Sequence, residues 1–226
     1  KSGDWYRFKV DTTGVHKLTS NFLRSLGVNT ATINPKNIKI YGHGGKSLPL
    51  LNSDTQSYDM IENTIQVIGE DDFTFNDDDY ILMYAIGPKK YNSDNNSHIN
   101  PYSDDAFYYL NISSGNGSRM NLATEPNTAA NVTFETFHDY KFVESDEYNI
   151  AKLGRRWFGH RFYVENTREF NFDFPNIITS SQINLKVYVA ATSESNTSMS
   201  LKLNGSEVNN FSFSSIDSQL LASEDS

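Results

Sequence analysis

The densest group of side chains with metal-binding chemistry is an acidic stretch in the first half of the chain. It contains Glu70-Asp71-Asp72 and, shortly after, Asn76-Asp77-Asp78-Asp79. Calcium prefers such carboxylate and amide oxygens, but the spacing lacks the glycine and glutamate positions of a helix-loop-helix calcium loop. We therefore predict the solvated tip of a hairpin. The alternative is a calcium site with Asp71, Asp77 and Asp79 as its ligands.

A glycine-rich segment that ends in lysine and serine, residues 42–47, could suggest a phosphate-binding loop. That motif requires another glycine five positions before its Gly-Lys pair, and a helix after it. Ile40 occupies the first of these positions, and Leu48-Pro49-Leu50 follows the segment in place of a helical pattern. The sequence favours a glycine-rich turn after a strand.

Nucleophiles and zinc ligands do not form a recognisable catalytic motif. The chain has no cysteine, which excludes disulfides, thiolate metal ligands and a cysteine nucleophile. No histidine pair has the helical i, i+4 spacing of a zinc protease, and no G-x-S-x-G turn occurs. The five histidines are His16, His43, His98, His138 and His160. We predict that this chain is not itself an enzyme and that it carries no cofactor, the possible calcium ion excepted.

The most distinctive segment places two arginines beside an aromatic pair, between two glycines. It reads Gly154-Arg155-Arg156-Trp157-Phe158-Gly159. Arg155 or Arg156 could tie this strand to a neighbour through a cation–π contact with Trp157 or through a carboxylate pair. We favour this internal structural role, and the alternative is a docking surface for another domain.

Exposed aromatic rings could instead bind sugars by stacking. The candidates are Trp5, Tyr102, Tyr108, Tyr109 and Trp157. Aromatic rings in strands usually face the core, so packing explains most of them more simply. A carbohydrate-binding or adhesive module is therefore the alternative function.

The composition narrows the classes of partner. The chain has 226 residues, a formal net charge of -9 and a pI of about 5.0. Its longest basic cluster is Arg155-Arg156 with Lys152 nearby, which is too small to neutralise a row of phosphates. We expect no nucleic-acid partner. No apolar run reaches the roughly 20 residues that span a bilayer, so we expect no transmembrane segment.

Alternation of apolar and polar residues predicts short strands through the first half of the chain. Tyr6, Phe8 and Val10 would share one face of a strand, with Arg7 and Lys9 on the other. The expected strands are 5–10, 15–18, 38–40, 64–68, 79–85 and 106–112.

A single short helix is expected between the second and third of these strands. Thr19 or Ser20 can cap its start, and Gly27 can end it.

The second half has the same alternation. The Asn204-Gly205 pair is a strong hairpin signal, because both residues tolerate positive φ. The expected strands are 133–140, 156–164, 170–174, 183–190, 198–203 and 208–213.

These patterns predict an all-β protein with one short helix and two modules. The chain becomes polar between Leu122 and Asn131, so we expect a first module over 1–125 and a second over 126–226. Strands at this spacing favour β-sandwiches or jelly rolls. The second module has few strands for such a fold, and we expect it to be incomplete. Its open edge would invite pairing with another chain, such as a second copy in an edge-strand dimer.

Several segments, taken in order, resemble one family. They are similar to the N-terminal region of the gingipain-like sortases of type IX secretion, the PorU family. The similar segments are GDWYRF (3–8), TGVHKL (13–18), NIKIYG (37–42), YDMIEN (58–63), DDYILMYA (78–85), NPYSD (100–104) and GRRWFG (154–159).

The resemblance implies an exported protein of the cell surface, associated with the outer membrane. In that family a C25-type cysteine-protease domain follows this β-rich region and removes the sorting domain from secreted cargo. The catalytic cysteine and histidine belong to that later domain, so no catalytic residue is carried over. The expected role is to help fold, dock or position the protease domain. The expected partners are that domain and other type IX secretion subunits.

Overall fold

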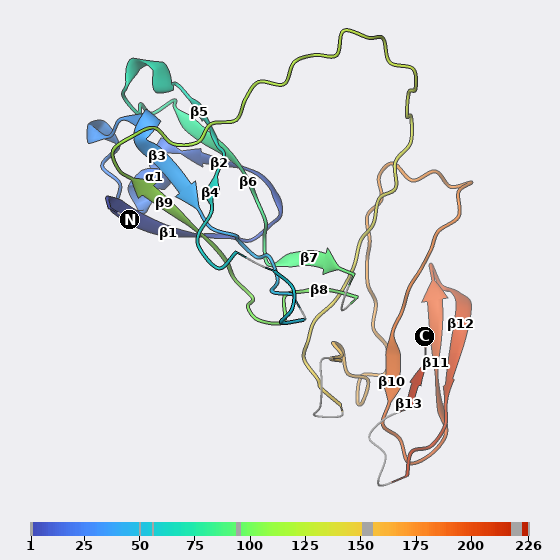
Figure 1. Ribbon diagram of the computed structural model, residues 1–226. Coiled ribbons are helices and arrows are strands. Elements are labelled where there is room, and N and C mark those ends of the chain that lie inside the picture. The colour runs from blue at the N-terminus through green and yellow to red at the C-terminus, as the bar shows by residue number, and fades with distance from the viewer. Residues whose placement is uncertain are drawn as a thin grey trace. The chain divides into compact units, whose positions relative to one another are not determined.

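A computed structural model describes residues 2–49, 51–55, 57–93, 96–150, 156–217 and 223–225 of the chain. Contacts divide the chain into two compact units, Lys1–Val132 and Thr133–Ser226. The regular structure is mostly antiparallel strands with one short α-helix, which confirms the predicted all-β class (Figure 1). Each unit is described below by itself.

The first sheet of the first unit joins strands from both ends of that unit. Its order is β1 (Asp4–Val10), β9 (Ala106–Ile112), β3 (Ile38–Tyr41) and β4 (Glu62–Asn63). All three neighbouring pairs are antiparallel. Strand β9 therefore lies between β1 and β3, and it pairs with β1 about 100 residues earlier in the sequence.

The second sheet of this unit has the order β2 (Gly14–Thr19), β6 (Tyr80–Ala85) and β5 (Gln66–Ile68), again antiparallel. A separate two-stranded sheet pairs β7 (Lys89–Asn92) with β8 (Ser97–Ile99). The strands expected in this half are all present, whereas the short strands β4, β7 and β8 were not predicted. Too few residues alternate in these three strands to produce a periodic signal.

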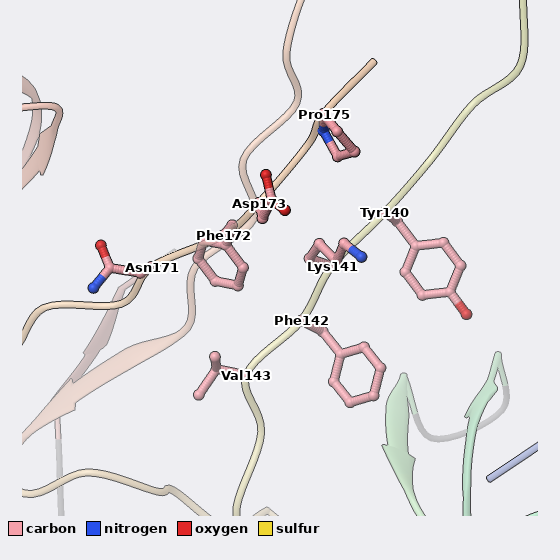
Figure 2. Close-up of a pocket in the computed structure, with 8 residues that line it drawn as sticks. All are labelled: Tyr140, Lys141, Phe142, Val143, Asn171, Phe172, Asp173 and Pro175. Carbon is pink, nitrogen blue, oxygen red and sulfur yellow. The ribbon is translucent and has the colours of Figure 1, made fainter. Parts of the chain in front are cut away.

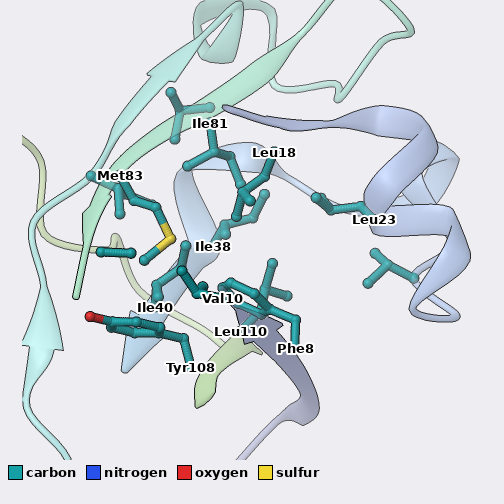
Figure 3. Close-up of a cluster of buried hydrophobic side chains, with 14 of the residues drawn as sticks. Phe8, Val10, Leu18, Leu23, Ile38, Ile40, Ile81, Met83, Tyr108 and Leu110 are labelled. Carbon is teal, nitrogen blue, oxygen red and sulfur yellow. The ribbon is translucent and has the colours of Figure 1, made fainter. Parts of the chain in front are cut away.

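One hydrophobic core lies between the two larger sheets. Side chains from the first sheet meet side chains from β2, β5 and β6 (Figure 3). Leu110 of β9, Ile40 of β3 and Ile81 of β6 are fully buried. Because successive strand residues point to opposite faces, the predicted alternation in β1 buries Phe8 and Val10 and exposes the lysine between them.

The short helix packs against this core. Helix α1 (Ser20–Ser25) begins after Thr19, whose side-chain oxygen accepts a hydrogen bond from the Phe22 amide at 3.3 Å. Gly27 follows the helix with a φ of 95°, a conformation that glycine adopts without strain. Leu23 is fully buried in the core. The remaining short helices are of the 3-10 type, at Thr30–Thr32, Pro35–Asn37 and Glu70–Asp72.

The second unit contains fewer strands than its sequence predicts. A hairpin pairs β11 (Thr197–Leu203) with β12 (Ser206–Phe213), and its turn residues Asn204 and Gly205 have φ values of 48° and 83°. The predicted hairpin is therefore confirmed. A second pair joins β10 (Val189–Ala191) to β13 (Ser223–Asp225).

Three predicted strands of the second unit are wrong, because the structure has no strand at 133–140, 156–164 or 170–174. A fourth, predicted at 183–190, is strand only from Val189 onward. Their aromatic and aliphatic side chains are largely exposed, including Phe134 at 88% and Val164 at 87%. An alternating pattern indicates that a segment is suited to a sheet, but a strand also requires a neighbouring backbone to pair with.

We expect the first unit to depend on the buried part of β9. Replacing fully buried Leu110 with alanine should lower the free energy of unfolding by about 2–5 kcal/mol, through lost burial and the cavity left behind. The same substitution at Leu122, which is 98% exposed, should change it by less than about 0.5 kcal/mol. Urea unfolding followed by Trp5 fluorescence, in a Trp157→Phe background, measures both. Equal effects would contradict this core assignment.

Candidate functional site

The structure gives each of the three candidate calcium ligands a different environment. The Asp71 side chain is fully exposed, and its closest cation is the Lys36 ammonium at 3.9 Å. Asp77 accepts a hydrogen bond from Arg24 at 2.7 Å. Asp79 is buried and accepts from the Asn76 amide at 2.7 Å. In the part of the chain that the structure describes, no three acidic or histidine side chains form a metal-binding group.

These contacts give the acidic stretch a structural role. The hydrogen bond from Arg24, and then its charge, lower the pKa of Asp77, so this carboxylate acts as a partner of helix α1. A Cβ on Gly69 would lie 1.7 Å from the Asp79 carboxylate, which therefore packs directly against the loop backbone. Calcium would have to compete with these partners, and the calcium site stays a prediction.

Only part of the arginine-tryptophan segment can be placed. Arg155 lies outside the described residues. Arg156 is exposed, and Trp157 is 45% exposed. The next residue, Phe158, pairs with Tyr148 through two backbone hydrogen bonds of 2.8 Å, which fixes the backbone beside Trp157. A partly exposed tryptophan ring beside an anchored backbone is compatible with both the internal and the docking role, and both stay predictions.

The candidate sugar-binding rings are divided between two faces. Tyr108 is buried in the core, whereas Trp5 and Tyr109 lie on the outer face of the first sheet and are partly buried. The Trp5 ring lies 5.3 Å from that of Tyr41, between ring centroids. Tyr102 is exposed on a loop. Two of the five rings thus share one face.

An open cleft lies within the second unit, between two extended segments. Residues 140–143 form one wall and residues 171–175 the other, around a volume of about 720 Å³. Figure 2 shows Tyr140 and Phe142 on one side of their segment and Lys141 and Val143 on the other. This is the alternation of a β-strand, although neither segment is part of a sheet.

The walls of this cleft combine apolar area with an extended backbone. Tyr140 is 65% exposed, Val143 52% and Phe172 44%. Lys141 and Asp173 supply one charge of each sign. An extended segment that belongs to no sheet can accept an added strand, which provides backbone hydrogen bonds and covers the apolar side chains. Such a site suits a polypeptide partner.

Sequence reasoning missed the polar contacts that fasten the end of the first unit. Arg119 donates to Glu70 at 2.9 Å and also to the backbone oxygens of Pro35, Lys36 and Ile38. These contacts are long-range, and no spacing rule connects residue 119 with residue 35 or residue 70. An isolated arginine in a loop therefore gave no signal.

Glu62 of β4 makes a second fastening contact. Its carboxylate accepts hydrogen bonds from the Ser118 amide at 2.7 Å and the Tyr41 hydroxyl at 3.1 Å. Burial alone would raise the pKa of Glu62, but these hydrogen bonds outweigh it and the pKa is lowered. The pKa of Tyr41 is raised, first by burial and then by its hydrogen bond to the Glu62 carboxylate.

Comparisons with known proteins include a similarity to a solved structure. No family model matches the chain, and no curated protein matches it. The solved structure of dimeric latent PorU from Porphyromonas gingivalis is similar over 57% of this chain, with 26% sequence identity and a TM-score of 0.38. The matched part makes up 11% of that PorU chain, so this chain spans a small fraction of its length.

The helices of the described residues include none that is both long and apolar enough to cross a bilayer.

The Glu62 contacts should make the first unit less stable in acid. The lowered pKa means that the contribution of Glu62 is present above its ordinary value of about 4.3 and is lost as the pH falls through the folded value. Glu62→Gln should therefore reduce the melting temperature most near pH 7, and the difference from the wild type should shrink below about pH 4.

Thermal unfolding between pH 3 and pH 7 measures this difference. Glu125→Gln, at an exposed position of the same unit, is the charge-matched control and should follow the wild type. A Glu62→Gln effect that stays constant across the pH range would contradict the assigned role of the carboxylate.

Proposed function

We propose that this chain is a non-catalytic accessory region of a cell-surface sortase of type IX secretion, and that its second unit holds the cysteine-protease domain. The observation that carries the proposal is the cleft between residues 140–143 and 171–175, whose walls are extended segments that belong to no sheet in the described structure. A segment of the protease domain adds a strand at this cleft and covers its aromatic side chains.

The segments that resemble the sortase family support this role because they build the framework. TGVHKL lies in β2 and pairs with DDYILMYA in β6, residue by residue from Gly14 opposite Ala85 to Thr19 opposite Tyr80. GDWYRF lies in β1 and pairs with β9. The similar residues pair as strands and pack in the core, so the similarity concerns the fold of this unit, as is expected of a scaffold.

The chemistry of such a sortase comes from another part of the polypeptide. Its nucleophile is a thiol, and this chain contains no cysteine. The chain is exported with the protease domain, acts at the outer membrane, and keeps that domain in position toward secreted cargo and the other secretion subunits. The solvent-exposed Trp157 adds a second apolar contact for docking.

A carbohydrate-binding or adhesive module is the second candidate. It is favoured by the outer face of the first sheet, where Trp5 and Tyr109 are partly exposed and Trp5 packs against Tyr41. Sugar stacking needs rings whose faces are open to solvent, and these rings are partly covered. We therefore rank the carbohydrate-binding module below the accessory role.

We expect amides in the two cleft walls to become protected when the protease domain binds. Hydrogen exchange should slow at residues 140–143 and 171–174 when the protease domain is supplied as a separate polypeptide, because an added strand pairs with these backbones. Strand β9, already inside a sheet, serves as the internal reference and should not change.

A matched pair of variants tests the contact itself. Phe172→Asp places a charge in the cleft and should weaken binding of the protease domain at least about tenfold, since a buried unpaired charge is costly. Phe73→Asp makes the same change at an exposed ring of the first unit and should leave binding unaltered. Equal exchange with and without the domain would exclude docking at this cleft.

A further inference from the structure

A second cleft, in the first unit, lies where the ends of its two sheets meet. The glycine-rich turn of residues 42–46 follows β3 and lines the cleft through Gly42, His43 and Lys46, and Tyr84 of β6 and Ile86 line it as well. Tyr108 of β9 also lines the cleft and is 2% exposed. The cleft has a volume of about 200 Å³.

The turn that lines this cleft is fixed by close backbone contacts. A Cβ on Gly44 would lie 2.4 Å from the Tyr108 hydroxyl oxygen, and one on Gly45 would lie 2.1 Å from the Gly87 carbonyl oxygen. The Gly45 amide donates to the Ile86 carbonyl at 2.9 Å. Only glycine can occupy these positions without moving the backbone, so the turn is formed before any ligand arrives.

Tyr108 offers the cleft a hydrogen-bond donor. The Tyr108 hydroxyl oxygen accepts from the Ile86 amide at 2.9 Å, and within the described residues the hydroxyl donates to no side chain or backbone oxygen. Burial raises the pKa of Tyr108, which keeps the hydroxyl proton in place. A buried tyrosine with a spare hydroxyl proton therefore lines the cleft.

The cleft is lined by basic side chains and by no acidic one. The basic side chains are those of His43 and Lys46, although the whole chain has a net charge of -9. The Lys46 ammonium is exposed and has no ion-pair partner in the described part of the chain. The His43 ring is held by a 2.9 Å hydrogen bond from Nε2 to the Asp59 carbonyl. The positive charge of Lys46 in this cleft favours an anionic ligand.

The size and the apolar walls narrow the ligand further. The volume of about 200 Å³ suits a small ligand, such as a ring with one charged substituent. Tyr84 is 57% exposed and Ile61 50%, so both present apolar area at the rim.

We propose that this cleft binds the carboxylate of a small cyclic organic acid. The Lys46 ammonium pairs with the carboxylate, the Tyr108 hydroxyl donates a hydrogen bond to the ligand, and the Tyr84 ring packs against the face of the ligand ring. Charge-assisted hydrogen bonds provide most of the affinity, and the tyrosine ring provides selectivity for a ligand with a flat face. The site is independent of docking through the second unit.

Amide chemical shifts of the whole chain test the proposal. Titration with glucuronate and with benzoate should give saturable shifts at the Gly42, Gly44 and Gly45 amides. Glucose and benzyl alcohol, the uncharged counterparts, should shift these amides less, with at least about tenfold weaker binding. The two acids separate a sugar acid from an aromatic acid as the preferred ligand.

Two pairs of variants test the roles of the side chains. Lys46→Met should weaken binding of the acids about tenfold, whereas Lys89→Met, at an exposed lysine of β7, should not. Tyr84→Ala should weaken binding, whereas Tyr102→Ala, at a ring of similar exposure, should not. The proposal fails if neither acid gives saturable shifts, if the uncharged compounds bind equally well, or if Lys46→Met binds like the wild type.

Discussion

Strand β9 provides the interaction on which the first unit depends. It pairs with β1 along seven residues on one side and with β3 on the other, and its inward side chains reach the shared core. Each of these pairings closes a long stretch of chain, which is costly in entropy and is repaid only when both sheets bury their apolar faces together. The two sheets and helix α1 therefore form one cooperative core.

The two units differ in how many of their alternating segments belong to a sheet. In the first unit the alternating segments find antiparallel partners, and the polar contacts of Arg119 and Glu62 fasten the last residues to β3 and β4. In the second unit residues 140–143 alternate in the same way but belong to no sheet. This contrast explains why a docking role is assigned to the second unit, and a framework role to the first.

The second unit also shows the cost of an extended segment that belongs to no sheet. Exposed aromatic and aliphatic side chains lose the free energy that burial would provide, and an open backbone invites association with any strand of suitable pattern. A partner that supplies a strand removes both costs at once. The small cleft of the first unit is different in kind, because its glycine turn, its buried hydroxyl and its basic rim are complete within one unit.

Local rules acting on the sequence were enough to predict the all-β class, the strands β1, β2, β3, β5, β6 and β9, the capped helix α1 and the Asn204-Gly205 hairpin. They succeed because side-chain direction, capping and turn conformation depend on neighbours a few residues away. The same rules placed strands at 133–140, 156–164 and 170–174, where the structure has none, because strand formation needs a partner that local pattern cannot supply. Only the tertiary structure gave Asp71, Asp77 and Asp79 their separate environments and brought Lys46, Tyr84 and Tyr108 around one cleft. Those arrangements are decided by which distant strands pair, and that depends on the burial of the whole core.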